Sequence, residues 1–167
     1  NAFLADYSEG KAFMHSHTYA GNPLACSCAL AVIKILKRDN IIEKANELGQ
    51  WLSKEFEQRF MQIDKVGGVR HIGLINALEL VKDRSTKEPF DSSLRLGYRI
   101  YQNALKKGLL LRPIGDILYF NPPLNIKKEE LKKAMDIAYE AITEELSKIS
   151  AKLKKINLSL TCIKKPL

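Results

Sequence analysis

Two short segments carry the side chains best suited to chemistry, and the first is a loop at residues 15–23. It reads His-Ser-His-Thr-Tyr-Ala-Gly-Asn-Pro. A hydroxyl beside backbone amides, just ahead of a helix N-terminus, favours an anion or phosphate site. Thr18 is therefore a candidate anion ligand. The alternative is a plain loop that leads into a helix, and the residue types leave both open.

Metal and disulfide chemistry are not expected. His15 and His17 stand two residues apart and could ligate a metal, but no acidic or thiol partner nearby completes the coordination shell. Cys26 and Cys28 lack the second Cys or His pair of a zinc site, and three cysteines do not make a disulfide framework. We expect the cysteines to be small, buried helix residues.

The second segment surrounds a single arginine at the end of an apolar run. Arg112 directly follows three leucines, at positions 109–111, and Tyr119 comes seven residues later. A guanidinium is costly to bury without a counter-charge, and its planar fork suits a carboxylate in two-point contact. That carboxylate belongs either to a substrate or to an internal ion pair with Glu79 or Asp116, and residue types alone do not choose between them.

Composition and charge exclude several other classes. Hydrophobic residues make up 46% and charged residues 28%, which is typical of a globular chain. No apolar run approaches the ~20 residues that span a bilayer, and no secretory leader is apparent, so we expect no membrane partner and a cytoplasmic location. The net charge of +8 comes largely from six lysines after residue 146, with no acids among them. Without interleaved aromatic residues, this stretch does not predict a nucleic-acid partner.

Helices and strands must position the two segments. Asn22 and Pro23 indicate an N-cap and first helical residue, followed by a helix to about residue 37 that is apolar nearly all round and therefore predicted to be deeply buried. Asn40 and Glu43 resemble a capping box. The helix they open has one apolar face, made of Ile41, Ala45, Leu48, Leu52, Phe56 and Phe60.

The rest of the chain alternates short strands and helices. We predict strands at 66–71, 73–81, 109–112 and 117–120, a charged loop at 82–91, and a helix over 92–107 that ends at Gly108. Lys107, in the last turn of that helix, is predicted to be structural. A final helix has its apolar face at Leu131, Met135, Ala138, Ile142 and Leu146. The order predicts an α+β fold, with a short, mostly antiparallel sheet covered by helices.

Three segments resemble one known family. Residues 13–26, with Phe-Met-His and Gly-Asn-Pro-Leu-Ala-Cys, closely resemble the signature that follows the cofactor lysine in class III aminotransferases. Residues 69–73 are similar to the family's Val-Arg-x-x-Gly strand. Residues 111–123, Leu-Arg-Pro-Ile-Gly-Asp-Ile-Leu-Tyr-Phe-Asn-Pro-Pro, resemble most the subgroup that uses S-adenosylmethionine and 8-amino-7-oxononanoate in biotin synthesis. The resemblance covers about residues 1–146.

The resemblance implies a fold and a division of the chain. Residues 39–146 would be the C-terminal small domain of a fold-type I pyridoxal-phosphate-dependent transferase. Residues 1–38 would be a loop and buried helix of the large-domain and dimer-interface region, and residues 147–167 a basic tail. The enzyme would be a homodimer in which pyridoxal 5'-phosphate forms a Schiff base with a lysine.

The resemblance also implies roles for individual residues. Thr18 would donate its hydroxyl to the cofactor phosphate of the neighbouring subunit, with Ser16 and His17 in the same cofactor-binding loop. Arg112 would bind the carboxylate of the oxononanoate, and Tyr119 and Ser16 would line the substrate pocket. Many relatives carry Gly at position 16 and Pro at position 17, whereas positions 18 and 112 match directly.

One departure concerns the catalytic lysine, which in the family precedes this segment. The chain opens with Asn1, and neither Lys11 nor Lys107 lies in an apolar strand end that would favour a Schiff base. We therefore expect a C-terminal fragment with no catalytic residue of its own, inactive alone. The alternatives are another class III aminotransferase, acting on ornithine or an omega-amino acid, and a non-catalytic truncation product with a basic binding tail.

Overall fold

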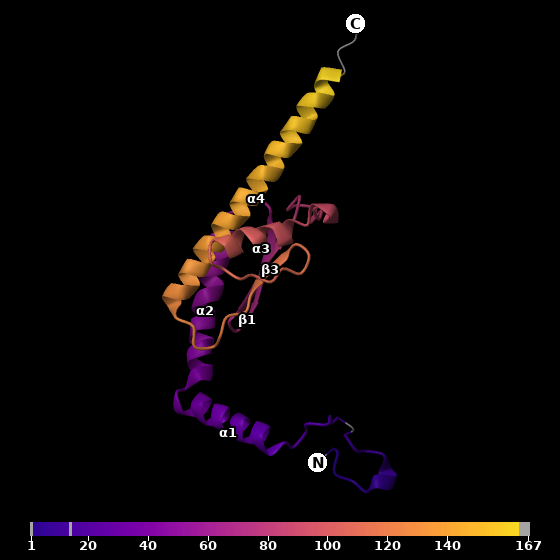
Figure 1. Ribbon diagram of the computed structural model, residues 1–167, viewed down its shortest axis with the longest axis vertical. Coiled ribbons are helices and arrows are strands. Elements are labelled where there is room, and N and C mark those ends of the chain that lie inside the picture. The colour runs from indigo at the N-terminus through magenta and orange to yellow at the C-terminus, as the bar shows by residue number, and fades with distance from the viewer. Residues whose placement is uncertain (1, 14, 164–167) are drawn as a thin grey trace. The chain divides into compact units, whose positions relative to one another are not determined.

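The chain forms two compact units in the computed structural model, which describes residues 2–13 and 15–163 and the side chains up to residue 151 (Figure 1). The first unit is Asn1–Asn40 and the second is Ile41–Leu167. The predicted boundaries at 38/39 and 146/147 rest on the resemblance, whereas this division follows contacts between residues. Each unit is described by itself.

The first unit contains the 3₁₀ turn η1 (Tyr7–Glu9) and helix α1 (Pro23–Arg38). The predicted N-cap is confirmed: the side chain of Asn22 accepts hydrogen bonds from the amides of Leu24 and Ala25, at 3.0 and 3.2 Å. The predicted deep burial is wrong, because no residue of α1 is buried. Cys26 and Cys28 are exposed as well. A helix that is apolar all round needs covering surfaces on several sides, and this unit does not supply them.

Helix α2 (Ile41–Phe60) opens the second unit and confirms the predicted apolar face. Ala45, Leu52, Phe56 and Phe60 are all buried. The capping box before it is wrong, because Asn40 has a left-handed backbone with φ of 51°, whereas an N-cap residue is extended. The helix begins directly after that turn.

The sheet is small and antiparallel, as predicted. Strands β1 (Val66–Ile72), β2 (Ile75–Leu80) and β3 (Ile117–Phe120) lie in the order β1-β2-β3. Residues alternate between two faces along each strand. One face contributes Leu78 and Leu118 to the core, and the other is largely exposed.

The predicted strand at 109–112 is wrong, and the reason is local. The amide of Leu109 donates to the carbonyl of Ala104 and so completes the end of the preceding helix, at 2.9 Å. Pro113 has no amide hydrogen to donate to a ladder. Pairing starts only at the isolated bridge between Ile114 and Ile117, where the chain turns into β3.

The predicted helix over 92–107 is present in two pieces. A 3₁₀ turn, η2 (Ser92–Leu94), is followed by α3 (Leu96–Lys106), and Arg95 between them has a left-handed φ of 47°. Gly108 ends the helix with φ of 90°, as predicted. The structural role of Lys107 is confirmed, because its ammonium lies 2.9 Å from Glu140 and 3.0 Å from Glu144.

The predicted loop between β2 and η2 is confirmed as a tight, charged excursion. The carboxylate of Asp83 accepts hydrogen bonds from the hydroxyl and amide of Ser85 and from the amide of Thr86. These bonds stabilise the charged form and lower the pKa of Asp83 to about 2. The loop is held by this turn and by bonds to the rest of the unit, because Lys87 donates to the carbonyl of Gly67 in β1 and Arg84 donates to the carbonyls of Met61 and Ile63.

Helix α4 (Lys128–Ile163) is the longest element and packs against α3 and α2. Leu131, Met135, Ala138 and Ile142 are buried as predicted. The helix continues without a break past residue 146, and Ile149 still belongs to the core. In Figure 1 its C-terminal part extends beyond α2 and α3.

Helix α3 lies so close to the turn before β3 that there is no room for a side chain at Gly97. A Cβ at Gly97 would overlap the carbonyl oxygen of Gly115 and lie 3.1 Å from the Cβ of Pro113. We expect Gly97→Ala to lower the free energy of unfolding by about 1–3 kcal/mol, as overpacked sites do. Urea titration of the variant measures this. Gly68→Ala, where nothing lies within 4 Å, is the matched control, and equal losses in both variants would contradict the expectation.

Candidate cofactor and substrate contacts

The loop before α1 is held by backbone turns that leave its side chains free. The amide of Ala20 donates to the carbonyl of His17 at 2.9 Å, and that of Asn22 donates to Tyr19 at 3.1 Å. Gly21, with φ of 73°, permits the second turn. Thr18 lies inside the first of these turns, between His17 and Ala20.

Three predicted cofactor ligands, Ser16, His17 and Thr18, lie together in this loop and are exposed. Within the described residues, none of their side chains makes a hydrogen bond, so their donors are available to a ligand. Two hydroxyls and an imidazole are chemically suited to a phosphate. The donor set therefore fits the phosphate end of a cofactor such as pyridoxal phosphate.

The helix N-terminus itself contributes less than its position suggests. Asn22 occupies the first two free amides of α1 through its side chain, and its carbonyl accepts from Cys26. Because these donors are already satisfied, an anion at this loop would be held by the side chains at 16–18 rather than by the helix amides.

The internal ion pair considered for Arg112 is not formed among the described residues. Arg112 is exposed and has no carboxylate partner there. Asp116 instead accepts a hydrogen bond from the amide of Gly97, at 3.1 Å, and so caps the first turn of α3. Glu79 is exposed on the sheet. The guanidinium is therefore free to bind a carboxylate that comes from elsewhere.

Tyr119 belongs to the same hairpin as Arg112. It lies in β3 opposite Ala77 and is half-buried. The bridge between Ile114 and Ile117 reverses the chain, and two residues outward from each bridge partner are Arg112 and Tyr119. The bridge thus turns the stretch that carries Arg112 back toward β3.

The position of Arg70 on the sheet, close to Tyr119 in register, was not predicted from the sequence. It pairs with Ala77 in β2, and Ala77 pairs with Tyr119 in β3. Arg70 and Tyr119 therefore share the exposed face of the sheet, one strand apart on either side of Ala77. Alternation along β1, with Val69 packed on the core, was the available signal.

A hollow of about 550 Å³ lies beside this hairpin. Its charged side chains are Glu79, Asp116 and Arg95, and the guanidinium of Arg95 lies over the ring of Tyr98 at 4.4 Å. Two acids and a stacked arginine do not suit a carboxylate ligand. The hollow is therefore a poor match for a substrate carboxylate.

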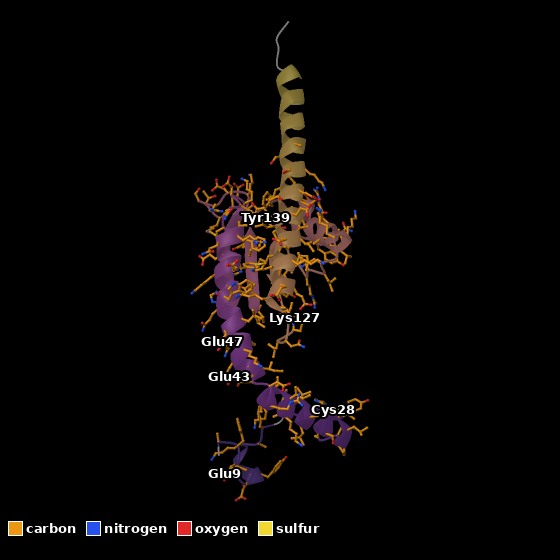
Figure 2. The ribbon with its side chains drawn as sticks, turned by 90° about the vertical axis from the view of Figure 1, so that its left-hand side faces the viewer. Glu9, Cys28, Glu43, Glu47, Lys127 and Tyr139 are labelled. Atoms are coloured by element: carbon orange, nitrogen blue, oxygen red, sulfur yellow. The ribbon has the colours of Figure 1, made fainter. Side chains whose placement is uncertain are left out.

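Figure 2 labels four potential metal ligands: Glu9 in η1, Cys28 in α1, and Glu43 and Glu47 beside each other on α2. Among the residues that the structure describes, no three His, Cys, Asp or Glu side chains come together as a metal site would need. None of the described helices is both long enough and apolar enough to cross a membrane.

Comparison with known proteins connects these contacts to a family. Residues 2–142 match the family Aminotransferase class-III. Over 144 residues the chain is 40% identical to the adenosylmethionine-8-amino-7-oxononanoate aminotransferase of Methanocaldococcus jannaschii, covering 86% of this chain and 31% of the relative. The chain thus spans about a third of the length of the curated relatives it matches.

Solved structures agree with the sequence comparison. The crystal structure of the Methanocaldococcus jannaschii enzyme superposes with a TM-score of 0.74 at 40% identity, over 85% of this chain and 32% of that one. A PLP-bound amine transaminase from an uncultivated Pseudomonas species has a TM-score of 0.73 at 33% identity, over 79% and 30%. The two units are thus part of the fold of the pyridoxal-phosphate-dependent aminotransferases, and the chain belongs to the class III aminotransferase family.

Proposed function

We propose that this chain is part of a transaminase that moves an amino group from S-adenosylmethionine to 8-amino-7-oxononanoate in biotin biosynthesis. Its class III membership and its 40% identity to relatives with that name support the substrates. The observation that carries the site is the exposed guanidinium of Arg112, which has no counter-charge among the described residues. In this proposal the enzyme is a cytoplasmic homodimer.

Each predicted site residue has one task in the proposal. The hydroxyl of Thr18 donates to the cofactor phosphate of the neighbouring subunit, with Ser16 and His17 beside it. Arg112 binds the substrate carboxylate in two-point contact, and Tyr119 closes the pocket next to it. When bound, pyridoxal phosphate supplies the electron sink for amino transfer.

A chimaera tests the proposal on a complete catalytic framework. Residues 1–146 replace the matched segment of the Methanocaldococcus jannaschii relative, which is about 31% of that protein. We expect the chimaera to bind pyridoxal phosphate and to convert 8-amino-7-oxononanoate with S-adenosylmethionine as donor. Cofactor binding without this conversion, but with turnover of ornithine or an omega-amino acid, would uphold the family and overturn the substrates.

Thr18→Val in this chimaera is expected to weaken binding of pyridoxal phosphate about tenfold to a hundredfold. The reason is the loss of one hydrogen bond to a charged group, which contributes about 1.5–3 kcal/mol. Fluorescence titration of the apo-chimaera measures the dissociation constant. Thr18→Ser keeps the hydroxyl and is the matched control. Equal affinities for the Val variant and the parent would remove Thr18 from the phosphate site.

The 167-residue chain by itself is proposed to be inactive, because the lysine that the family uses precedes the matched segment. Incubation with pyridoxal phosphate, followed by borohydride reduction and peptide mass mapping, is expected to leave no stoichiometric adduct at any single lysine. A stable adduct at one lysine, such as Lys11, would overturn this part of the proposal.

A further inference from the structure

The two substrates of the proposed function carry their carboxylates at different distances from the carbon that reacts. In S-adenosylmethionine the carboxylate is attached to the same carbon as the amino group. In 8-amino-7-oxononanoate six bonds separate the carboxyl carbon from the keto carbon, which is about 7–8 Å in an extended chain. Because both substrates react at the same place, one fixed guanidinium does not meet both carboxylates. If Arg112 binds the acceptor, the donor carboxylate needs a second cation.

Arg70 lies on the same sheet face as Tyr119, which lines the pocket in the proposed function. Arg70 of β1 pairs with Ala77 of β2, and Ala77 pairs with Tyr119 of β3. Residues directly opposite each other in antiparallel strands point to the same face. Two strand spacings of about 4.8 Å place the outer members of this row about 10 Å apart. This separation is close to the difference between the two carboxylate positions.

The residue between Arg70 and Tyr119 in this row is small. Ala77 has only a methyl group, so the middle strand places no large side chain between the guanidinium and the phenol ring within the row. Arg70 itself is exposed and Tyr119 is half-buried. A guanidinium and a phenolic hydroxyl are both donors that suit a carboxylate. The row therefore has the donors for a second carboxylate contact.

The charge of Arg70 is not used by another described residue. No carboxylate lies within ion-pair distance of it in the part of the chain that the structure describes. Glu79 is the one acidic residue in the three strands. It pairs with Gly68, two residues before Arg70, and so lies diagonally from Arg70 on the same face. The two charges are neighbours in the sheet, yet they form no ion pair.

We propose that Arg70 binds the carboxylate of the amino donor, while Arg112 binds the carboxylate of the acceptor. The inference rests on the proposed function, because it assigns one of the two substrates of that reaction. Arg70 then contributes to the choice of donor: it favours an α-amino acid, whose carboxylate is next to the reacting carbon, over an amine that has no carboxylate.

Arg70→Ala in the chimaera tests this assignment. We expect kcat/KM for S-adenosylmethionine to fall about tenfold, as the loss of one charge-assisted hydrogen bond does, and kcat/KM for 8-amino-7-oxononanoate to stay unchanged. Steady-state kinetics with each substrate varied in turn measures both values. Arg70→Lys keeps the charge and is expected to recover part of the loss. An unchanged donor value, or an equal fall for both substrates, would overturn the inference.

A ligand without the carboxylate separates direct contact from a structural role of Arg70. Decarboxylated S-adenosylmethionine, used as a competitive inhibitor against the donor, lacks the group that Arg70 binds in this proposal. Its inhibition constant is therefore expected to be the same in the parent chimaera and in the Arg70→Ala variant. An Arg70 that only holds the sheet in shape would weaken both ligands alike, and that result would contradict direct contact.

Glu79→Gln is the matched control on the same face of the sheet. If Arg70 and Glu79 paired with each other in the complete enzyme, the two variants would lose donor kcat/KM to the same extent. We expect Glu79→Gln to retain the parent value, because the acid does not contact the substrate carboxylate. A loss equal to that of Arg70→Ala would replace the inferred substrate contact with an internal ion pair.

Failure of this inference differs from failure of the proposed function. A parent chimaera that binds pyridoxal phosphate but does not use S-adenosylmethionine overturns the proposed substrates, and the role of Arg70 falls with them. A parent chimaera that uses S-adenosylmethionine, together with an Arg70→Ala variant that uses it equally well, leaves the proposed function in place and overturns the role of Arg70 alone.

Discussion

Replacing Arg112 with alanine in the chimaera is expected to raise the KM for 8-amino-7-oxononanoate by about thirtyfold or more. Removing one partner of a charge pair in a closed pocket costs about 2–5 kcal/mol, and every 1.4 kcal/mol is about tenfold. Among the described residues Arg112 has no carboxylate partner, so we expect the loss to come from the contact with the substrate. Steady-state kinetics with the acceptor varied measures the effect.

The control for this prediction is an arginine with a known structural partner. Arg59 lies on α2 and pairs with Asp136 of α4. We expect Arg59→Ala to leave the KM for the acceptor unchanged, and both variants to retain the cofactor. An Arg112 variant whose KM stays at the parent value would show that the carboxylate is bound elsewhere, with Arg70 the next residue to test.

Phe56→Ala is expected to lower the free energy of unfolding by about 3–5 kcal/mol. Phe56 is 1% exposed, and its ring centroid lies 4.5 Å from Phe60 and 5.2 Å from Phe120, the latter edge-on. Truncation removes buried apolar area and leaves a cavity between α2 and the sheet, and both effects destabilise the fold.

Denaturant titration followed by circular dichroism measures this loss in the 167-residue chain. Phe3→Ala is the matched control, because Phe3 is 62% exposed and surface substitutions change stability by only about 0.5 kcal/mol. A loss below about 1 kcal/mol for the Phe56 variant would mean that the aromatic cluster does not hold α2 on the sheet.

Periodicity predicted the elements that bury one face within their own unit. The apolar faces of α2 and α4 and the first two strands follow directly from spacing, because each packs on the shared core. The predicted bounds of strands and helices were wrong where a backbone hydrogen bond or a backbone dihedral angle sets the end of the element. The stretch after Gly108 is not a strand because Leu109 completes α3, and α3 starts late because Arg95 is left-handed.

The burial of α1 was mispredicted for a related reason. Its residues are apolar all round, which predicts burial, but none is buried in this chain. Leu24 is 79% exposed. The chain spans about a third of the length of its curated relatives, and nothing described in the first unit buries this helix. The apolar pattern of a helix predicts that the helix is buried, but it does not identify the residues that bury it.

The residues of the candidate site come from the sequence, and their roles stay predictions. The loop at 15–23 and the arginine hairpin were both identified from sequence, whereas the choice between substrate and internal counter-charge for Arg112 was open. Among the described residues Arg112 forms no ion pair, and Asp116 accepts a hydrogen bond from the amide of Gly97 instead. Arg70 was missed because its relation to Tyr119 passes through the register of three strands.

A crystal structure of the chimaera with pyridoxal phosphate and 8-amino-7-oxononanoate bound is the most direct test. We predict that the Thr18 hydroxyl lies within hydrogen-bonding distance of the cofactor phosphate, about 2.5–3.0 Å, and that Arg112 contacts the substrate carboxylate through two nitrogens. A cofactor phosphate held without Thr18, and a substrate carboxylate remote from Arg112, would contradict the account.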